Sequence, residues 1–155
     1  MNILEKYPEE KVEKVVYKKI TQRNVDDGVY DNFVELHYPS NIVAIFPEGD
    51  CCSFSYLVEI TKYPFKNLKN KKITDIYKVT DKKLIDELYK YKRFLDLRDS
   101  KYNTGEDQSY LYKVDLSSRE NFYFGLINSS NGWYEGWIDV VESPKPGSEF
   151  TFLDM

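Results

Sequence analysis

The stretch SYLYKVDLSSRENFYFGLINSSNGWYEGWIDVV, residues 109–141, decides the fold class, because three strand-like runs follow one another closely in it. These runs are rich in β-branched and aromatic residues, and clusters of turn-forming residues separate them. Asn131-Gly132 favours a tight hairpin, since both positions tolerate positive φ. We therefore expect an antiparallel meander in the last third of the chain.

The upstream sequence adds further strands and one helix. Alternating or continuous apolar runs predict strands near 15–21, 29–38, 41–46 and 71–80. The run 52–60 fits either a strand or a short helix capped by Ser53 or Ser55. Residues 81–95 predict a helix, because Leu84, Leu88, Tyr91 and Leu95 recur at helical spacing behind a Thr80 or Asp81 cap.

These runs indicate an α+β, mainly β fold. We expect a compact antiparallel roll or small sandwich of about seven or eight strands with one helix near 81–95. The length of 155 residues fits a single domain over 1–155. Residues 1–10 and 143–155 are expected to be loosely ordered at its ends.

Composition limits the functional classes. The formal net charge is −4, so a basic footprint for nucleic acid is absent at the level of the whole chain. Basic clusters at 66–72 and 82–93 are interpreted as solvated faces. The 18 lysines against four arginines, together with a single alanine, indicate the coding bias of an AT-rich genome, as in large DNA viruses, phages and some bacteria.

The sequence predicts a soluble protein in a reducing compartment. The first residues have no apolar core of a signal peptide, and no run has the length of a membrane span. Two adjacent cysteines make no disulfide framework. We expect the cytoplasm (the host-cell cytoplasm for a viral protein) or the virion as its location.

Cys51 and Cys52 are the only cysteines and invite chemical interpretations. A metal site would need His37 and Asp50 as well as both cysteines, and this set lacks the paired spacing of zinc sites. A Cys51 nucleophile would need His37, the one histidine, as its base. No nucleotide, metalloprotease or hydrolase motif is present, so we expect no enzyme, metal or cofactor and assign Cys52 to the core.

A second conspicuous stretch is SSNGWYEGW, residues 129–137. It places Trp133, Tyr134 and Trp137 directly after the Asn131-Gly132 turn. Core packing accounts for one or two of these aromatic residues. An exposed aromatic side chain beside a loop would suit recognition of a protein or a ligand.

The two stretches together resemble a small domain family of unknown function from phages, large DNA viruses and bacteria. The matching segments are Asp50-Cys51-Cys52-Ser53, Asn70–Ile76 and Ser130-Asn131-Gly132-Trp133-Tyr134. This sequence differs at Asn70, where glycine is usual, at Trp133, where tyrosine is usual, and in a longer insertion around 81–107. The resemblance covers residues 30–140 and implies a compact β-rich module without an established activity.

We therefore predict a non-enzymatic protein-binding module, viral in origin, that contacts a virion or host protein and favours neither nucleic acid nor membrane. The alternative is a small-ligand or nucleotide-binding protein with a pocket between 50–53 and 131–134. A cysteine-dependent enzyme is the third hypothesis. The candidate binding residues are Asp50, Cys51, Ser53, Asn131, Trp133 and Tyr134.

Overall fold

Eleven strands and two helices make up the described part of the chain in this computed structural model. It describes residues 4, 7, 9–22, 29–30, 32–49, 54–90, 94–96, 106–130, 135–142 and 151–154. The strands are β1 (Lys14–Gln22), β2 (Val29–Tyr30), β3 (Asn32–His37), β4 (Ile42–Gly49), β5 (Phe54–Ile60), β6 (Ile73–Lys78), β7 (Phe94–Asp96), β8 (Glu106–Leu116), β9 (Tyr123–Ser130), β10 (Gly136–Glu142) and β11 (Thr151–Asp154). The helices are the 3-10 helix η2 (Phe65–Leu68) and the α-helix α1 (Lys82–Lys90).

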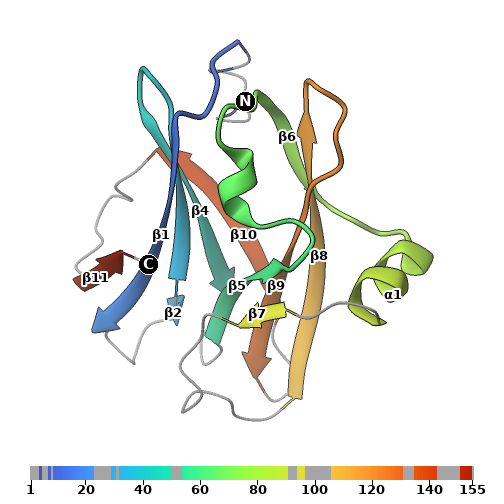
Figure 1. Cartoon of the computed structure of the whole chain (residues 1–155). Helices are drawn as coiled ribbons and strands as arrows, with labels where there is room; N and C mark the ends of the chain where they lie inside the picture. The colour runs from blue at the N-terminus through green and yellow to red at the C-terminus, as the bar shows by residue number, and fades with distance from the viewer. Residues whose placement is uncertain are drawn as a thin grey trace.

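The strands form two sheets (Figure 1). The five-stranded sheet has the order β10-β4-β3-β1-β11, and all its pairs are antiparallel. The six-stranded sheet has the order β2-β5-β9-β8-β6, with β7 also on β5, and only the short β2–β5 pair is parallel. We call them the first and second sheet.

The main hydrophobic core lies between the two sheets. It combines Val34 and Ile45 of the first sheet with Leu57, Phe124 and Leu126 of the second, each almost completely buried. Alternation explains the arrangement, because every second residue of a strand points to the same face. Burial of these side chains against each other is the main force that holds the sheets face to face.

The outer face of the second sheet has its own cover. Helix α1 is amphipathic, and Leu84, Ile85 and Leu88 pack on Leu111 and Tyr123. Asp81 caps the helix, since its Oδ1 accepts hydrogen bonds from the Lys83 and Leu84 N–H groups at 3.0 and 3.4 Å. Among the described residues, no helix is long and apolar enough to cross a membrane.

The structure confirms the fold class predicted from the sequence. Eight strands have six or more residues, while β2, β7 and β11 are shorter. The run 52–60 is extended from Phe54 onward, so the alternative of a short capped helix there is wrong. The helix of the 81–95 region ends at Lys90, and Leu95 lies in β7, where it pairs with Glu59 of β5.

The expected meander is wrong in its third strand. Strands β8 and β9 pair as predicted, but β10 leaves the second sheet and pairs with β4 of the first. The second edge of β9 is occupied by β5. Local turn preference at Asn131-Gly132 therefore yields to long-range strand pairing.

Asn70, which lies between η2 and β6, has a φ of 68°. This left-handed conformation is favoured by glycine, and asparagine tolerates it better than most residues. Asparagine at this position therefore suits the backbone turn between η2 and β6.

Candidate functional site

The six candidate residues all lie in segments 50–53 and 131–134, which are outside the described residues. The positions on either side of both segments are described. Gly49 at the end of β4 pairs with Gly136 at the start of β10, and Phe54 at the start of β5 pairs with Ser129 near the end of β9. Both segments therefore connect the first and second sheets, and their ends lie side by side.

We call this place the corner; it consists of the strand ends at Gly49, Phe54, Ser129 and Gly136. Figure 1 shows β4, β5, β9 and β10 converging on it from the two sheets. The strand order explains the convergence, because β4 neighbours β10 in one sheet while β5 neighbours β9 in the other.

Buried polar side chains lie under the corner. Ser55 and Asn128 are paired across β5 and β9, and both are completely buried. The Asn128 Nδ2 group donates a hydrogen bond to Ser55 Oγ at 2.9 Å. A buried amide needs such partners, so this bond links the two strands that lead into the corner.

Gly136 permits the close contact between the sheets at this point. A Cβ atom at this position would lie 2.9 Å from Asn128 Cβ and 3.1 Å from Ser55 Oγ. Strand β10 is held further along by Tyr112 of β8, whose hydroxyl oxygen accepts a hydrogen bond from the Ile138 N–H. Burial raises the pKa of Tyr112, while this hydrogen bond opposes the shift.

The chain crosses from one sheet to the other at a third place, next to Ser55. Tyr30 of β2 pairs with Ser55, and after one intervening residue the chain continues as β3 in the first sheet. The buried Asn32 side chain then continues the hydrogen bonding that β2 makes to β5. Its Nδ2 donates to the Leu57 carbonyl at 3.0 Å, and its Oδ1 accepts from the Leu57 N–H at 2.8 Å. The side-chain amide thus satisfies main-chain groups that the departing strand no longer reaches.

Trp137 is the exposed aromatic residue at the corner. It pairs with Glu48 across β10 and β4, and 44% of its surface is exposed, the larger value of the two large hydrophobic residues that are exposed among the described residues. Trp137 belongs to the aromatic cluster noted in the sequence but was not among the candidate binding residues. Strand alternation is the signal that could have identified it: Ile138 points inward, so its neighbour Trp137 points outward.

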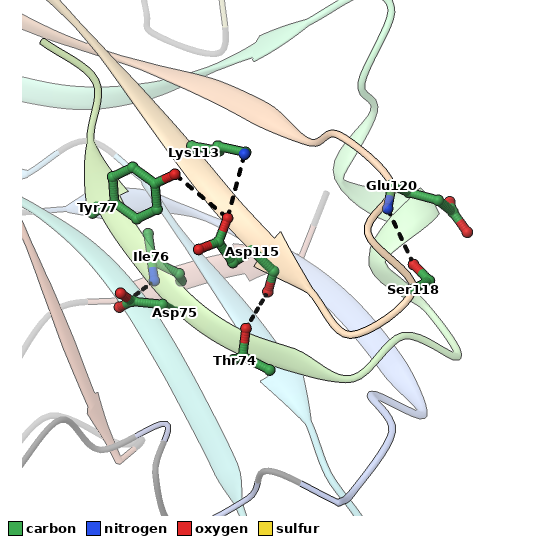
Figure 2. A network of polar contacts seen from close by, with 8 residues as sticks. All are labelled: Thr74, Asp75, Ile76, Tyr77, Lys113, Asp115, Ser118 and Glu120. Atoms are coloured by element: carbon green, nitrogen blue, oxygen red, sulfur yellow. Dashed lines mark hydrogen bonds and ion pairs between the residues drawn. The ribbon is translucent and has the colours of Figure 1, made fainter.

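The other exposed large hydrophobic residue, Tyr77, lies in a polar network on β6 and β8 (Figure 2). Its hydroxyl donates to Asp115 Oδ1 at 3.5 Å, and Lys113 Nζ lies 3.5 Å from the same oxygen. Asp75 Oδ1 accepts from the Ile76 N–H at 2.8 Å. The hydrogen bond to Asp115 explains why the Tyr77 side chain lies at the surface. The described contacts offer no such explanation for the exposure of Trp137.

His37 is far from the corner along the first sheet. It pairs with Ile42 at the start of β4, seven residues before Gly49, which corresponds to about 23 Å of strand. His37 Nε2 lies 3.2 Å from Glu35 Oε1, and Lys18 Nζ lies 3.6 Å from that oxygen. This placement argues against His37 as the base or co-ligand of Cys51. Among the described residues, no group of three or more His, Cys, Asp or Glu side chains could hold a metal ion.

Comparison with known proteins links the chain to a virus. It is similar to "Uncharacterized protein L278" of Acanthamoeba polyphaga mimivirus, with 32% identity over 96 residues. The match covers 62% of this chain and 65% of the relative, so the chain spans less than two thirds of that protein. No protein-family model and no solved structure matches the chain. The similarity agrees with the expected viral association, and it assigns no activity to the chain.

Proposed function

We propose that the protein is a non-enzymatic protein-binding module of viral origin that uses the corner to contact a virion or host protein. The contact surface would comprise Asp50, Cys51 and Ser53 from one segment, Asn131, Trp133 and Tyr134 from the other, and Trp137 beside them. The observation that carries the proposal is the pairing of Gly49 with Gly136 and of Phe54 with Ser129.

Two arguments favour protein recognition. Trp and Tyr dominate the binding energy of protein interfaces, and this region supplies three such residues within five positions. Loops at the end of a sheet scaffold can vary without disturbing the core, so binding residues are often placed there. The buried Ser55–Asn128 bond would give these loops a fixed base. Host cytoplasm or virion is the location that such a role implies.

Affinity capture with matched variants tests the proposal. The tagged full chain is incubated with lysate of the natural host, and bound proteins are quantified for wild type, Trp133→Ala, Trp137→Ala and Tyr77→Ala. We expect a stoichiometric partner with wild type and Tyr77→Ala, and a loss of about tenfold or more with either tryptophan variant. Equal capture by all four proteins, at equal melting temperatures, would contradict the proposal.

A small-ligand or nucleotide site between 50–53 and 131–134 is the second candidate. The completely buried polar pair Ser55 and Asn128 favours it, because polar groups at the base of a site fix the orientation of a ligand. Thermal-shift measurements with nucleotides distinguish the candidates. A shift that is lost in Asp50→Asn but kept in Trp137→Ala indicates the ligand site, whereas no shift with any nucleotide counts against it.

A further inference from the structure

A segment of this acidic protein without any acidic residue lies at the end of β5 opposite to the corner. Residues 60–74 contain five lysines and no acidic residue, although the whole chain has a net charge of −4. The rest of the chain therefore carries a net charge of −9. Such segregation of charge is a property that can select partners and steer their approach.

This basic segment is held rigidly by buried anchors. Phe65 and Leu68 of η2 are completely buried in the main core, and Phe65 packs edge-on against Tyr17 with 5.0 Å between ring centroids. The Phe65 N–H also donates to Glu59 Oε1 at 2.6 Å. Lys66 in η2 and Lys69, the extended residue directly after it, are both exposed.

The five lysines divide into two groups. Lys71 binds Glu120 at 2.6 Å, a hydrogen bond that lowers the pKa of Glu120, and Lys72 binds Glu9 at 3.2 Å. Lys62, Lys66 and Lys69 are exposed and form no ion pair with any described residue. We call these three residues the lysine patch; no described acidic side chain compensates their positive charge.

We propose that the lysine patch is a second interaction surface that binds a short acidic segment of a protein partner. Three ammonium groups within eight residues match a cluster of a few carboxylates. The partner segment needs few further acidic residues on either side of this cluster, because the rest of the chain carries a net charge of −9. The patch lies beyond the far end of β5, so it works independently of the corner.

Nucleic acid fits the same place less well. A nucleic acid strand is charged along its whole length, whereas this chain outside residues 60–74 carries a net charge of −9. Binding of single strands also relies on exposed aromatic rings. The Tyr63 ring at the patch already packs against Tyr123 and Phe122, with centroid distances of 5.4 and 5.9 Å, and Lys62 Nζ lies 5.7 Å from its centre.

The test uses the full chain and a fluorescent peptide with four consecutive glutamates between neutral Gly-Ser arms. Binding is followed by fluorescence anisotropy at about 20 mM and about 200 mM salt, where screening lengths differ several-fold. We expect saturable binding at low salt that weakens at high salt. The Lys62→Gln/Lys66→Gln/Lys69→Gln variant should raise Kd about tenfold, since it removes three exposed ion pairs.

Lys82→Gln/Lys83→Gln is the matched control, because both lysines are exposed at the start of α1 and do not belong to the patch. This control should bind the peptide within about twofold of wild type. Equal weakening in the control, or no binding at low salt, overturns the proposal. Binding of an oligothymidylate or of phosphatidylserine vesicles through the same three lysines, at equal or higher affinity, also overturns it. Loss of either tryptophan at the corner should leave peptide binding unchanged.

Discussion

The corner and η2 lie at opposite ends of β5, and different interactions hold them in place. At the corner, partners distant in sequence meet through polar groups, as Ser55 and Asn128 do across 73 residues. At η2, a local turn is fixed by apolar anchors that enter the main core. One end of the molecule therefore depends on strand pairing and hydrogen bonds, and the other on side-chain burial.

The largest effect should come from the apolar end. Phe65→Ala removes a completely buried ring and leaves a cavity, which costs about 3–5 kcal/mol of unfolding free energy. Urea denaturation measures this cost, and the exposed neighbour Lys66→Ala should change stability by less than about 0.5 kcal/mol. Comparable losses in both variants would show that burial at η2 does not decide its stability.

The next largest effect should come from the polar crossing at Asn32. Asn32→Ala leaves the buried Leu57 N–H and carbonyl without their side-chain partners, and each lost partner costs about 1–3 kcal/mol. We expect a loss of about 2–4 kcal/mol in urea denaturation. Exposed Asn67→Ala serves as the control, and a loss in Asn32→Ala no larger than the control's would contradict the role of the amide.

Gly136→Ala tests the close contact at the corner. The added methyl group would lie 2.9 Å from Asn128 Cβ, so packing has to shift, at a cost of about 1–3 kcal/mol. Hydrogen exchange should then increase around Ser55 and Asn128 and stay unchanged in η2. A uniform increase in exchange over both ends would remove the distinction between them.

A pH series addresses the contact between Tyr17 and η2. The Tyr17 hydroxyl donates to Glu59 Oε1 at 3.1 Å, and burial, reinforced by the negative charge of Glu59, raises the pKa of Tyr17 well above its ordinary value of 10.0. Above pH 10 the unfolded chain loses this proton while the folded chain keeps it, so stability falls as pH rises. The Tyr17→Phe variant has no hydroxyl at this position, so its stability lacks this dependence on pH.

The stability difference between wild type and Tyr17→Phe should therefore shrink by about 1.4 kcal/mol between pH 8 and pH 11. Other buried tyrosines are present in both proteins and cancel in this difference. Urea denaturation at both pH values measures it. A difference that is constant with pH would show that Tyr17 ionises in the folded protein as it does in the unfolded chain.

The smallest effect concerns coupling between the two ends. In a Phe65→Ala/Gly136→Ala double variant, the two losses should add to within about 0.5 kcal/mol, because the sites share no contacts among the described residues. A larger interaction energy in a double-mutant cycle would mean that the ends are not independent.

Much of the strand pattern could be predicted from the sequence because it is local. Alternation in 29–38 identified Val34 and Leu36 as core residues, and the spacing of Leu84 and Leu88 identified the helix. The end of that helix could not be predicted, since Leu95 continues the helical spacing yet pairs with β5. Long-range pairing decides such cases.

The candidate site was predictable only in part. Sequence patterns identified segments 50–53 and 131–134, but their proximity depends on β4 pairing with β10 and β5 with β9. The strong hairpin signal at Asn131-Gly132 predicted the wrong partner for β10, because turn preference is local and the edges of β9 are already filled. The structural roles of Asn32 and Asn128 were missed, since neither residue differs in sequence from a surface asparagine.

The amide of Asn32 also has a consequence for tracing the ancestry of this chain. Aspartate in its place would lack the donor, and glutamine would be one methylene too long to meet both groups of Leu57. We therefore expect descendants of the same ancestor to keep this asparagine after overall similarity has faded, while position 57 can vary because it contributes only main-chain groups. Such an asparagine, separated from a short strand by one residue and at the start of the next strand, could guide searches among viral genomes in which ordinary sequence comparison no longer finds relatives.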